Sequence, residues 1–157
     1  MRGGKYSIFE AGTRVPYIVS WPAKIKPGIS DAMICQMDLL SSFSKMLKIK
    51  LPAGDAMDSE DVLSALLGKS QKARKVLVEQ GAQSIAIVQD NWKYIESNKG
   101  QAMNVLTNIE LGNSQQAQLY DLKNDIGEKN NLAEKYPQKL SELVKLLQNI
   151  REGNAKK

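Results

Sequence analysis

The residues best suited to chemistry lie near the amino terminus, where two glycines precede a lysine. Gly3 and Gly4 let the backbone approach a ligand closely, and the ammonium group of Lys5 suits an oxyanion such as phosphate or sulfate. Glu10 and Arg14 follow, just before a segment that is expected to form a strand. Charged groups crowded ahead of a strand often support an active site. Short Gly-Lys patterns are nevertheless common, so composition alone also allows an ordinary turn.

Other candidates for nucleophiles and metal ligands are few. The 157 residues include no histidine and one cysteine, which excludes a histidine triad, a histidine base and most catalytic zinc or iron sites. Cys35 has no charged neighbour that would stabilise a thiolate, so it is expected to be a small buried side chain. The grouped aspartates lack the spacing of a calcium loop, and turns and caps explain them: Asp55, Asp58 and Asp61, and Asp121 and Asp125.

The positive net charge of +5 does not predict a nucleic-acid surface. The lysines are scattered among acids, and the densest basic stretch, residues 69–75, is short and typical of a solvated linker or helix face. Aromatic residues make up only 6% of the chain and form no stacking platform. No apolar run is long enough to cross a bilayer, and no secretory signal is expected in this chain.

Hydrophobic periodicity and turn residues predict the elements that must position the chemistry. Branched and aromatic residues predict a strand over 15–21, and a polar boundary is expected at 69–75. The predicted helices cover about 36–47, 62–67 and 137–152, and the predicted strands cover 85–88, 92–95 and 118–122. Strands followed by a helix on one face predict an α+β fold, with a small antiparallel sheet packed against the long carboxy-terminal helix. Residues 97–117 read as a loop that contains a weak strand or a turn of helix and has no assignable role, and residues 153–157 are expected to fray.

Several ordered motifs of this sequence resemble the second half of the type I sulfatases, a family that includes arylsulfatases and N-acetylgalactosamine-6-sulfatases. The resemblance covers nearly the whole chain and departs from the family pattern at Ala11, where glycine is usual; we expect alanine to be tolerated. The motifs are Arg2-Gly3-Gly4-Lys5, Glu10-Ala11-Gly12-Thr13-Arg14-Val15-Pro16, Trp21-Pro22, Asp38-Leu39-Leu40, Asp58 with Leu63, Leu66-Leu67-Gly68, Trp92-Lys93-Tyr94, Gln118-Leu119-Tyr120-Asp121-Leu122, Asn124-Asp125, Gly127-Glu128 and Asn131-Leu132-Ala133.

The resemblance implies a role for three of these residues. Lys5 matches the lysine that holds a sulfate oxygen, while Glu10 and Arg14 match residues that brace the turn before the strand. Residues 1–70 match the end of the catalytic α/β domain, an alkaline-phosphatase-like fold whose terminal strand and helices they would form. Residues 75–152 match the smaller α+β subdomain.

The same resemblance shows which family features this sequence lacks. Cys35 is not followed by the Pro-X-Arg pattern of the family's formylglycine motif, and the segments that carry the calcium ligands and catalytic histidines have no counterpart here. We therefore expect neither metal nor cofactor in this chain; calcium and formylglycine belong to the full-length family. The predicted function is a carboxy-terminal sulfatase fragment that is inactive alone.

Alternatives remain open at this point. The chain could be a non-enzymatic binding module that keeps the sulfatase fold, and an upstream Cys-X-Pro-Ser-Arg motif would discriminate between the two hypotheses. The expected partner of a full-length parent is a sulfated sugar or an aryl sulfate, with no nucleic acid and no membrane. Truncation also predicts association, as a homo-oligomer formed through the strand at 15–21 and the helix at 36–47. Full-length members of this family are commonly periplasmic or secreted. The sequence does not identify the substrate.

Overall fold

The computed structural model describes residues 1–153. Backbone contacts divide the chain into two compact units. The sheet unit comprises Met1–Pro16 and Val76–Lys157, and the helical unit comprises Tyr17–Lys75. The polar boundary expected at 69–75 coincides with the end of the helical unit at Lys75. The first sixteen residues, however, belong to the sheet unit. The assignment of 1–70 and 75–152 to two sulfatase domains remains a prediction.

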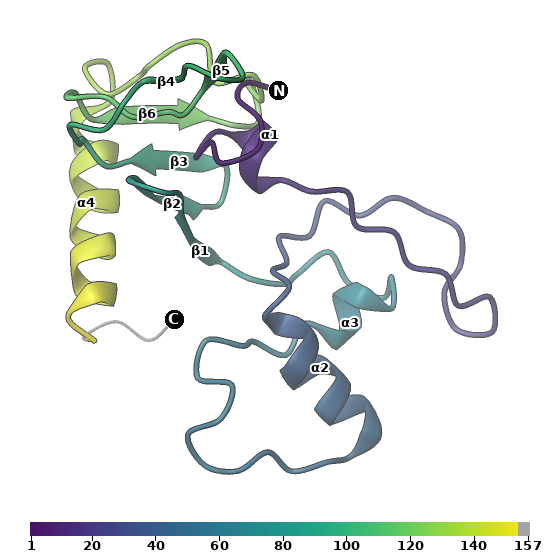
Figure 1. Cartoon of the computed structure of the whole chain (residues 1–157). Helices are drawn as coiled ribbons and strands as arrows, with labels where there is room; N and C mark the ends of the chain where they lie inside the picture. Colours follow the sequence, from purple (N-terminus) through teal and green to yellow (C-terminus); the bar gives the residue numbers. More distant parts are fainter. Residues whose placement is uncertain (154–157) are drawn as a thin grey trace. The chain divides into compact units, whose positions relative to one another are not determined.

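An antiparallel sheet of four strands, in the order β1-β2-β3-β6, forms the centre of the sheet unit (Figure 1). Its strands are β1 (Val76–Gln80), β2 (Ile85–Gln89), β3 (Trp92–Ile95) and β6 (Gln118–Asp121). Gln89 pairs with Trp92 across a tight two-residue turn, in which Asp90 adopts a positive φ of 55°. The predicted hairpin and the strand at 118–122 are confirmed, whereas the sequence analysis missed β1.

The two faces of this sheet are covered by different parts of the unit. Successive side chains of a strand point to opposite faces, so Ile87 and Tyr94 pack on the helix α4 (Pro137–Arg151) through Leu143 and Leu147. The other face packs on the amino-terminal segment, and this second cluster consists of Ile8, Phe9, Ala86, Ile95 and Tyr120. The predicted carboxy-terminal helix and its apolar stripe are therefore confirmed. Of the tail expected to fray, residues 154–157 lie outside the described residues.

Shorter elements complete the sheet unit. The helix α1 (Glu10–Thr13) follows the Gly-Gly-Lys segment. The ribbon of β4 (Met103–Asn104) and β5 (Ile109–Glu110) lies within the segment that was expected to be a loop. No helix among residues 1–153 is long and apolar enough to span a membrane.

The helical unit contains α2 (Asp38–Leu47) and α3 (Leu63–Leu66), which confirms both predicted helices. The strand predicted over 15–21 is wrong, because these residues form no ladder and Ile18 is 92% exposed. A strand needs a hydrogen-bonding neighbour, and nothing within residues 1–153 pairs with this segment. The α+β class holds through the sheet unit, without the expected terminal strand.

Candidate functional site

The Gly-Gly-Lys segment forms a tight turn that leaves the Lys5 side chain exposed. Gly3 and Tyr6 both adopt a positive φ, of 83° and 74°. This conformation is common for glycine and unusual for a bulky aromatic residue. The Ser7 N–H donates to the Gly4 carbonyl over 2.9 Å. Lys5 Nζ lies 5.0 Å from the centre of the Tyr6 ring, and within residues 1–153 no ion pair includes Lys5. Its ammonium group is therefore available to an anion.

The helix α1 packs directly against this turn. A Cβ atom added at Gly12 would lie 2.2 Å from the Ser7 carbonyl oxygen and 2.5 Å from that of Gly4, so a side chain there would displace the turn. The Ala11 N–H donates to the Arg2 carbonyl over 3.0 Å. Ala11 is exposed and its φ is not positive, so alanine fits where the family usually has glycine.

Arg2 ties the turn to the β4–β5 ribbon and to Glu128. Its guanidinium donates two hydrogen bonds to the Glu110 carboxylate, over 2.7 and 2.8 Å, and one to the Glu128 carbonyl over 2.8 Å. The same guanidinium lies 4.2 Å from the centre of the Phe9 ring. A bidentate pair of this kind fixes orientation as well as distance.

Glu10 and Arg14, the two residues that the resemblance marks as braces, contact each other. Arg14 Nη1 lies 3.5 Å from Glu10 Oε2, with the Arg14 side chain half exposed and the Glu10 side chain buried. The second carboxylate oxygen of Glu10 accepts a hydrogen bond from Lys93 Nζ over 2.9 Å. The Glu10 N–H donates to Glu128 Oε2 over 2.7 Å.

Lys93 is the centre of a buried charge cluster that the sequence analysis missed. Its side chain is 0% exposed, and its ammonium group pairs with Glu10 at 2.9 Å, Glu79 at 2.9 Å and Glu128 at 3.4 Å. Lys93 pairs with Tyr120 in the sheet register, so it lies on the face that the amino-terminal segment covers. Lys93 lies two residues before Ile95 in an apolar hairpin, so it must point to the same face of the sheet as Ile95. This spacing was the sequence signal for a buried lysine.

Opposing effects set the pKa values in this cluster. Burial raises the pKa of Glu128 to about 6, although the Lys93 charge and the Glu10 N–H oppose it. Burial likewise raises the pKa of Glu79 against the pull of Lys93. Burial lowers the pKa of Lys93, but the three carboxylates outweigh it and the net pKa is raised. Lys93 therefore stays charged while at least one glutamate can take up a proton near neutral pH.

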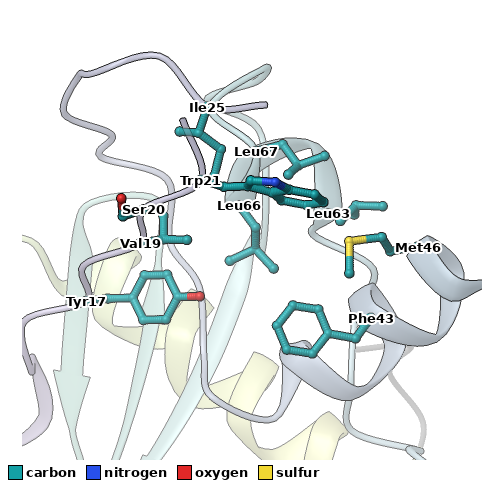
Figure 2. Close-up of a pocket in the computed structure, with 10 residues that line it drawn as sticks. All are labelled: Tyr17, Val19, Ser20, Trp21, Ile25, Phe43, Met46, Leu63, Leu66 and Leu67. Carbon is teal, nitrogen blue, oxygen red and sulfur yellow. The ribbon is translucent and has the colours of Figure 1, made fainter. Parts of the chain in front are cut away.

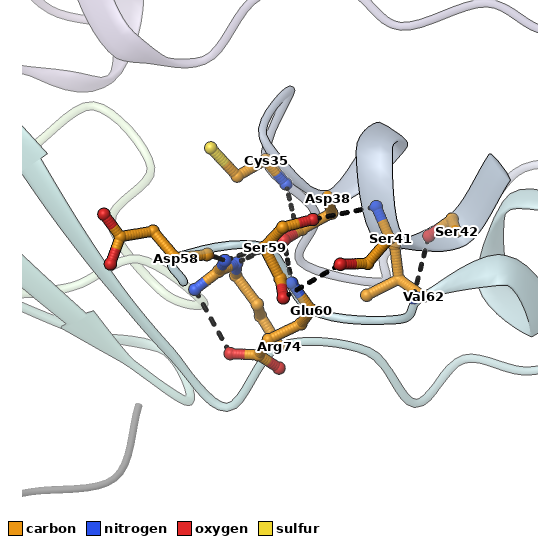
Figure 3. A network of polar contacts seen from close by, with 9 residues as sticks. All are labelled: Cys35, Asp38, Ser41, Ser42, Asp58, Ser59, Glu60, Val62 and Arg74. Carbon is orange, nitrogen blue, oxygen red and sulfur yellow. Dashed lines mark hydrogen bonds and ion pairs between the residues drawn. The ribbon is translucent and has the colours of Figure 1, made fainter. Parts of the chain in front are cut away.

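The helical unit has a buried network of its own, between Asp38 and Arg74 (Figure 3). Arg74 donates to both Asp38 carboxylate oxygens, and the N–H groups of Cys35 and Glu60 donate to them over 2.9 Å each. Arg74 Nη1 also pairs with Glu60 at 3.1 Å. Arg74 is therefore an anchor of the unit and does not belong to a solvated basic run, which corrects the sequence analysis. Burial raises the pKa of Asp38, but Arg74 and the two N–H donors lower it further, to below its usual value.

An apolar pocket of about 220 Å³ lies in the same unit (Figure 2). Aromatic and aliphatic side chains line it, and the polar groups of the lining residues are the hydroxyls of Tyr17 and Ser20 and the indole N–H of Trp21. The lining residues are Tyr17, Val19, Ser20, Trp21, Ile25, Phe43, Met46, Leu63, Leu66 and Leu67. Because the wall carries no charged side chain, the pocket does not suit a sulfate group. Within residues 1–153, no three His, Cys, Asp or Glu side chains come together to hold a metal ion.

Comparison with known proteins places these features in a family. No family model matches the chain. An N-acetylgalactosamine-6-O-sulfatase of Bacteroides thetaiotaomicron is 46% identical over 151 residues, which is 96% of this chain and 30% of that protein. A ulvan-active sulfatase of Formosa agariphila is 31% identical over 155 residues, covering 83% of this chain and 31% of that protein.

Solved structures agree with the sequence relatives. A Bacteroides thetaiotaomicron protein, solved in work on the metabolism of multiple glycosaminoglycans, superposes with a TM-score of 0.92 at 45% identity, over 96% of this chain and 32% of its own. A protein solved with its substrate D-glucosamine-2-N,6-O-disulfate shares the fold, with a TM-score of 0.58 at 22% identity, over 84% of this chain and 27% of its own. The chain belongs to the type I sulfatase family and matches the carboxy-terminal portion of its members. It spans about a third of the length of these relatives.

Proposed function

We propose that this chain is the carboxy-terminal part of a sulfatase that acts on sulfated sugars, and that Lys5 contacts the sulfate. The observation that carries the proposal is the exposed ammonium group of Lys5 on a turn fixed by Arg2 and Gly12. This turn lies inside a match that covers 96% of the chain. A positive charge held in place before the reaction stabilises the negative charge of the sulfate as the ester bond breaks.

Glu10 and Arg14 would act indirectly. The Glu10 carboxylate is engaged by Lys93 and Arg14, so it is not free to serve as an acid or base. Its role would be to hold α1 against the Lys5 turn. Arg14, half exposed at the end of α1, would limit the movement of the Glu10 side chain.

We also propose that the chain is catalytically silent by itself. Hydrolysis of a sulfate ester needs a nucleophile, a cation and a leaving-group acid, and this chain offers the cation. Cys35 donates its N–H to Asp38 within the helical unit and lies outside any formylglycine motif. The nucleophile and calcium would come from a portion corresponding to the rest of the relatives. The purified chain should not hydrolyse an aryl sulfate, and measurable turnover would contradict this.

The domain assignment and the association follow from the same proposal. Residues 17–75 expose many apolar side chains, among them Ile18, Ile29 and Leu47. In a full-length enzyme they would pack on the catalytic portion, where residues 1–70 would form the end of the α/β domain and residues 75–152 the smaller subdomain. Without that portion, the chain should form homo-oligomers through this surface, and light scattering at high concentration should detect them. A clean monomer would argue against the assignment.

Inorganic sulfate tests the role of Lys5 directly. Amide NMR spectra of the full chain, titrated with sodium sulfate against sodium chloride of equal ionic strength, should show saturable shifts at Gly3, Gly4 and Lys5. Lys5→Met should abolish these shifts. The matched control is Lys99→Met, which removes another exposed lysine and should leave them intact. Equal shifts in the wild type and in Lys5→Met would contradict the proposal.

A further inference from the structure

We infer that Lys93 and Glu128 are positioning residues that hold the Lys5 turn in its anion-binding geometry. The inference rests on the proposed role of Lys5 and extends it to side chains remote in sequence. Neither residue needs to touch the sulfate. Both act through the amino-terminal segment that carries Lys5.

Glu128 holds this segment at two points. Its carboxylate accepts the Glu10 N–H over 2.7 Å, and its carbonyl accepts Arg2 Nη1 over 2.8 Å. Lys5 lies between these two points in the sequence. Glu128 itself has a positive φ of 50° and is fully buried. A non-glycine residue persists in that conformation only where its surroundings enforce it.

Lys93 anchors the same segment to the sheet. Its ammonium group reaches the Glu10 side chain from β3 over 2.9 Å and is 0% exposed. The helix α1 that carries Glu10 packs closely on the turn, since a Cβ atom at Gly12 would lie within 2.5 Å of the carbonyl oxygens of Gly4 and Ser7. A change at the cluster is therefore transmitted to Lys5 through backbone contacts.

The cluster also couples the turn to protonation. Three carboxylates share one ammonium group, so the cluster carries excess negative charge when all are ionised. Lys93 from β3, Glu10 from α1 and Tyr120 from β6 interact with the Glu128 carboxylate. Glu79 from β1 shares the Lys93 ammonium group, and Arg2 donates to the Glu128 carbonyl. Protonation of Glu128, whose pKa is about 6, weakens its hold on the Glu10 N–H.

The test follows the turn itself, by NMR of the full chain between pH 4.5 and 7.5 in chloride buffer without sulfate or phosphate. The amides of Gly3, Gly4 and Lys5 should titrate with a midpoint near 6. Glu128→Gln, which keeps the shape of the side chain, should remove this titration. Glu134→Gln is the matched control, since it neutralises an exposed glutamate of the same segment, and it should leave the titration unchanged.

Sulfate affinity gives the second readout. Lys93→Met should weaken sulfate binding at the turn by about 5- to 10-fold, whereas Lys99→Met should not change it. Lys93→Arg should recover part of the loss because it restores the charge. If Lys93→Met fails to fold, the pH titration of the turn amides in the isosteric Glu128→Gln variant still tests the inference.

Two outcomes would overturn the inference: a folded Glu128→Gln variant whose turn still titrates near 6, or a wild-type turn that does not titrate. A turn that titrates in the wild type and not in Glu128→Gln, yet binds no sulfate, supports the coupling and contradicts the role proposed for Lys5. The two proposals can therefore fail separately. A purely structural role of the cluster would change stability without moving the pH response of the turn.

Discussion

The sheet unit and the helical unit bury their apolar residues to very different extents. Among residues 1–16 and 76–153, eleven apolar side chains are buried and eight large ones are exposed. In residues 17–75, three apolar side chains are buried and eleven large ones are exposed. Apolar burial is the main stabilising contribution to folding. The sheet unit therefore has an apolar core of its own. The helical unit buries few apolar side chains and leaves most of its large ones exposed.

The buried charges of the two units differ as well. In the helical unit, Asp38 and Arg74 form a close pair whose remaining acceptor sites are filled by backbone N–H groups. In the sheet unit, Lys93 faces three glutamates. In the first arrangement the charge of Asp38 is matched by that of Arg74. In the second, three carboxylates surround one ammonium group and leave excess negative charge next to the segment that carries Lys5. The difference separates a network suited to structure from one that can respond to pH.

The largest expected effect is the loss of Arg74. Arg74→Met leaves the 0% exposed Asp38 carboxylate without its counterion, which costs about 3 to 5 kcal/mol when a buried pair is broken. Hydrogen exchange should become fast throughout residues 33–74 and stay slow in the sheet unit. As a control, Arg151→Met removes the exposed pair with Glu96 and should cost at most about 1 kcal/mol. If the amides of both units exchanged faster together, the two units would not unfold independently and the prediction would be wrong.

Truncation of one leucine in each unit tests the difference in packing. Leu147→Ala, at a position 1% exposed in α4, should destabilise the sheet unit by about 3 kcal/mol, because it leaves a cavity. Measured at a dilution where the chain is monomeric, Leu40→Ala, at a position 51% exposed in α2, should change the stability by about 0.5 kcal/mol or less. Chemical denaturation measures both. A large effect of Leu40→Ala at that dilution would contradict the difference in packing between the two units.

The smallest expected effect is a response to mild acid in the sheet unit that the helical unit does not share. Glu128 has a folded pKa of about 6, against an ordinary value of 4.5 for a glutamate side chain. The folded state therefore binds more protons at Glu128 between these values, so the contribution of Glu128 to stability is fully present below 4.5 and is lost as the pH rises through 6. The change amounts to about 2 kcal/mol. Because the pKa of Asp38 is lowered, the helical unit keeps its contribution over this range and loses it only in stronger acid.

Denaturation curves at pH 5 and pH 7, followed separately in each unit by hydrogen exchange, measure this response. The sheet unit of Glu128→Gln should show a flatter dependence. Equal responses in both units would remove the distinction between the two charge networks.

Local patterns in the sequence were enough to predict several elements of the fold. The apolar stripe of 137–152 and the periodicity of 36–47 predicted α4 and α2, because one amphipathic face identifies a helix. The prediction of a strand at 15–21 failed because branched residues favour a strand only where a partner supplies the ladder. β1 was missed because Val76-Leu77-Val78 directly follows the basic stretch that was taken as a boundary.

The candidate site was predictable only in part. The Gly-Gly-Lys motif identified Lys5, and the resemblance identified Glu10 and Arg14. The contacts of Lys93 with Glu10, Glu79 and Glu128 join residues separated by up to 83 positions, and no local pattern encodes such distances. Arg74 was misjudged for the same reason, since its partner Asp38 lies 36 residues away.

The role of Lys5 in sulfate recognition is tested most directly by comparing a sulfated sugar with its unsulfated counterpart. Amide NMR titrations of the full chain with N-acetylgalactosamine 6-sulfate and with N-acetylgalactosamine would measure it. Saturable shifts are expected at Gly3, Gly4 and Lys5 with the sulfated sugar alone, and none in Lys5→Met. Equal shifts with both sugars, or shifts confined to residues 17–75, would contradict it.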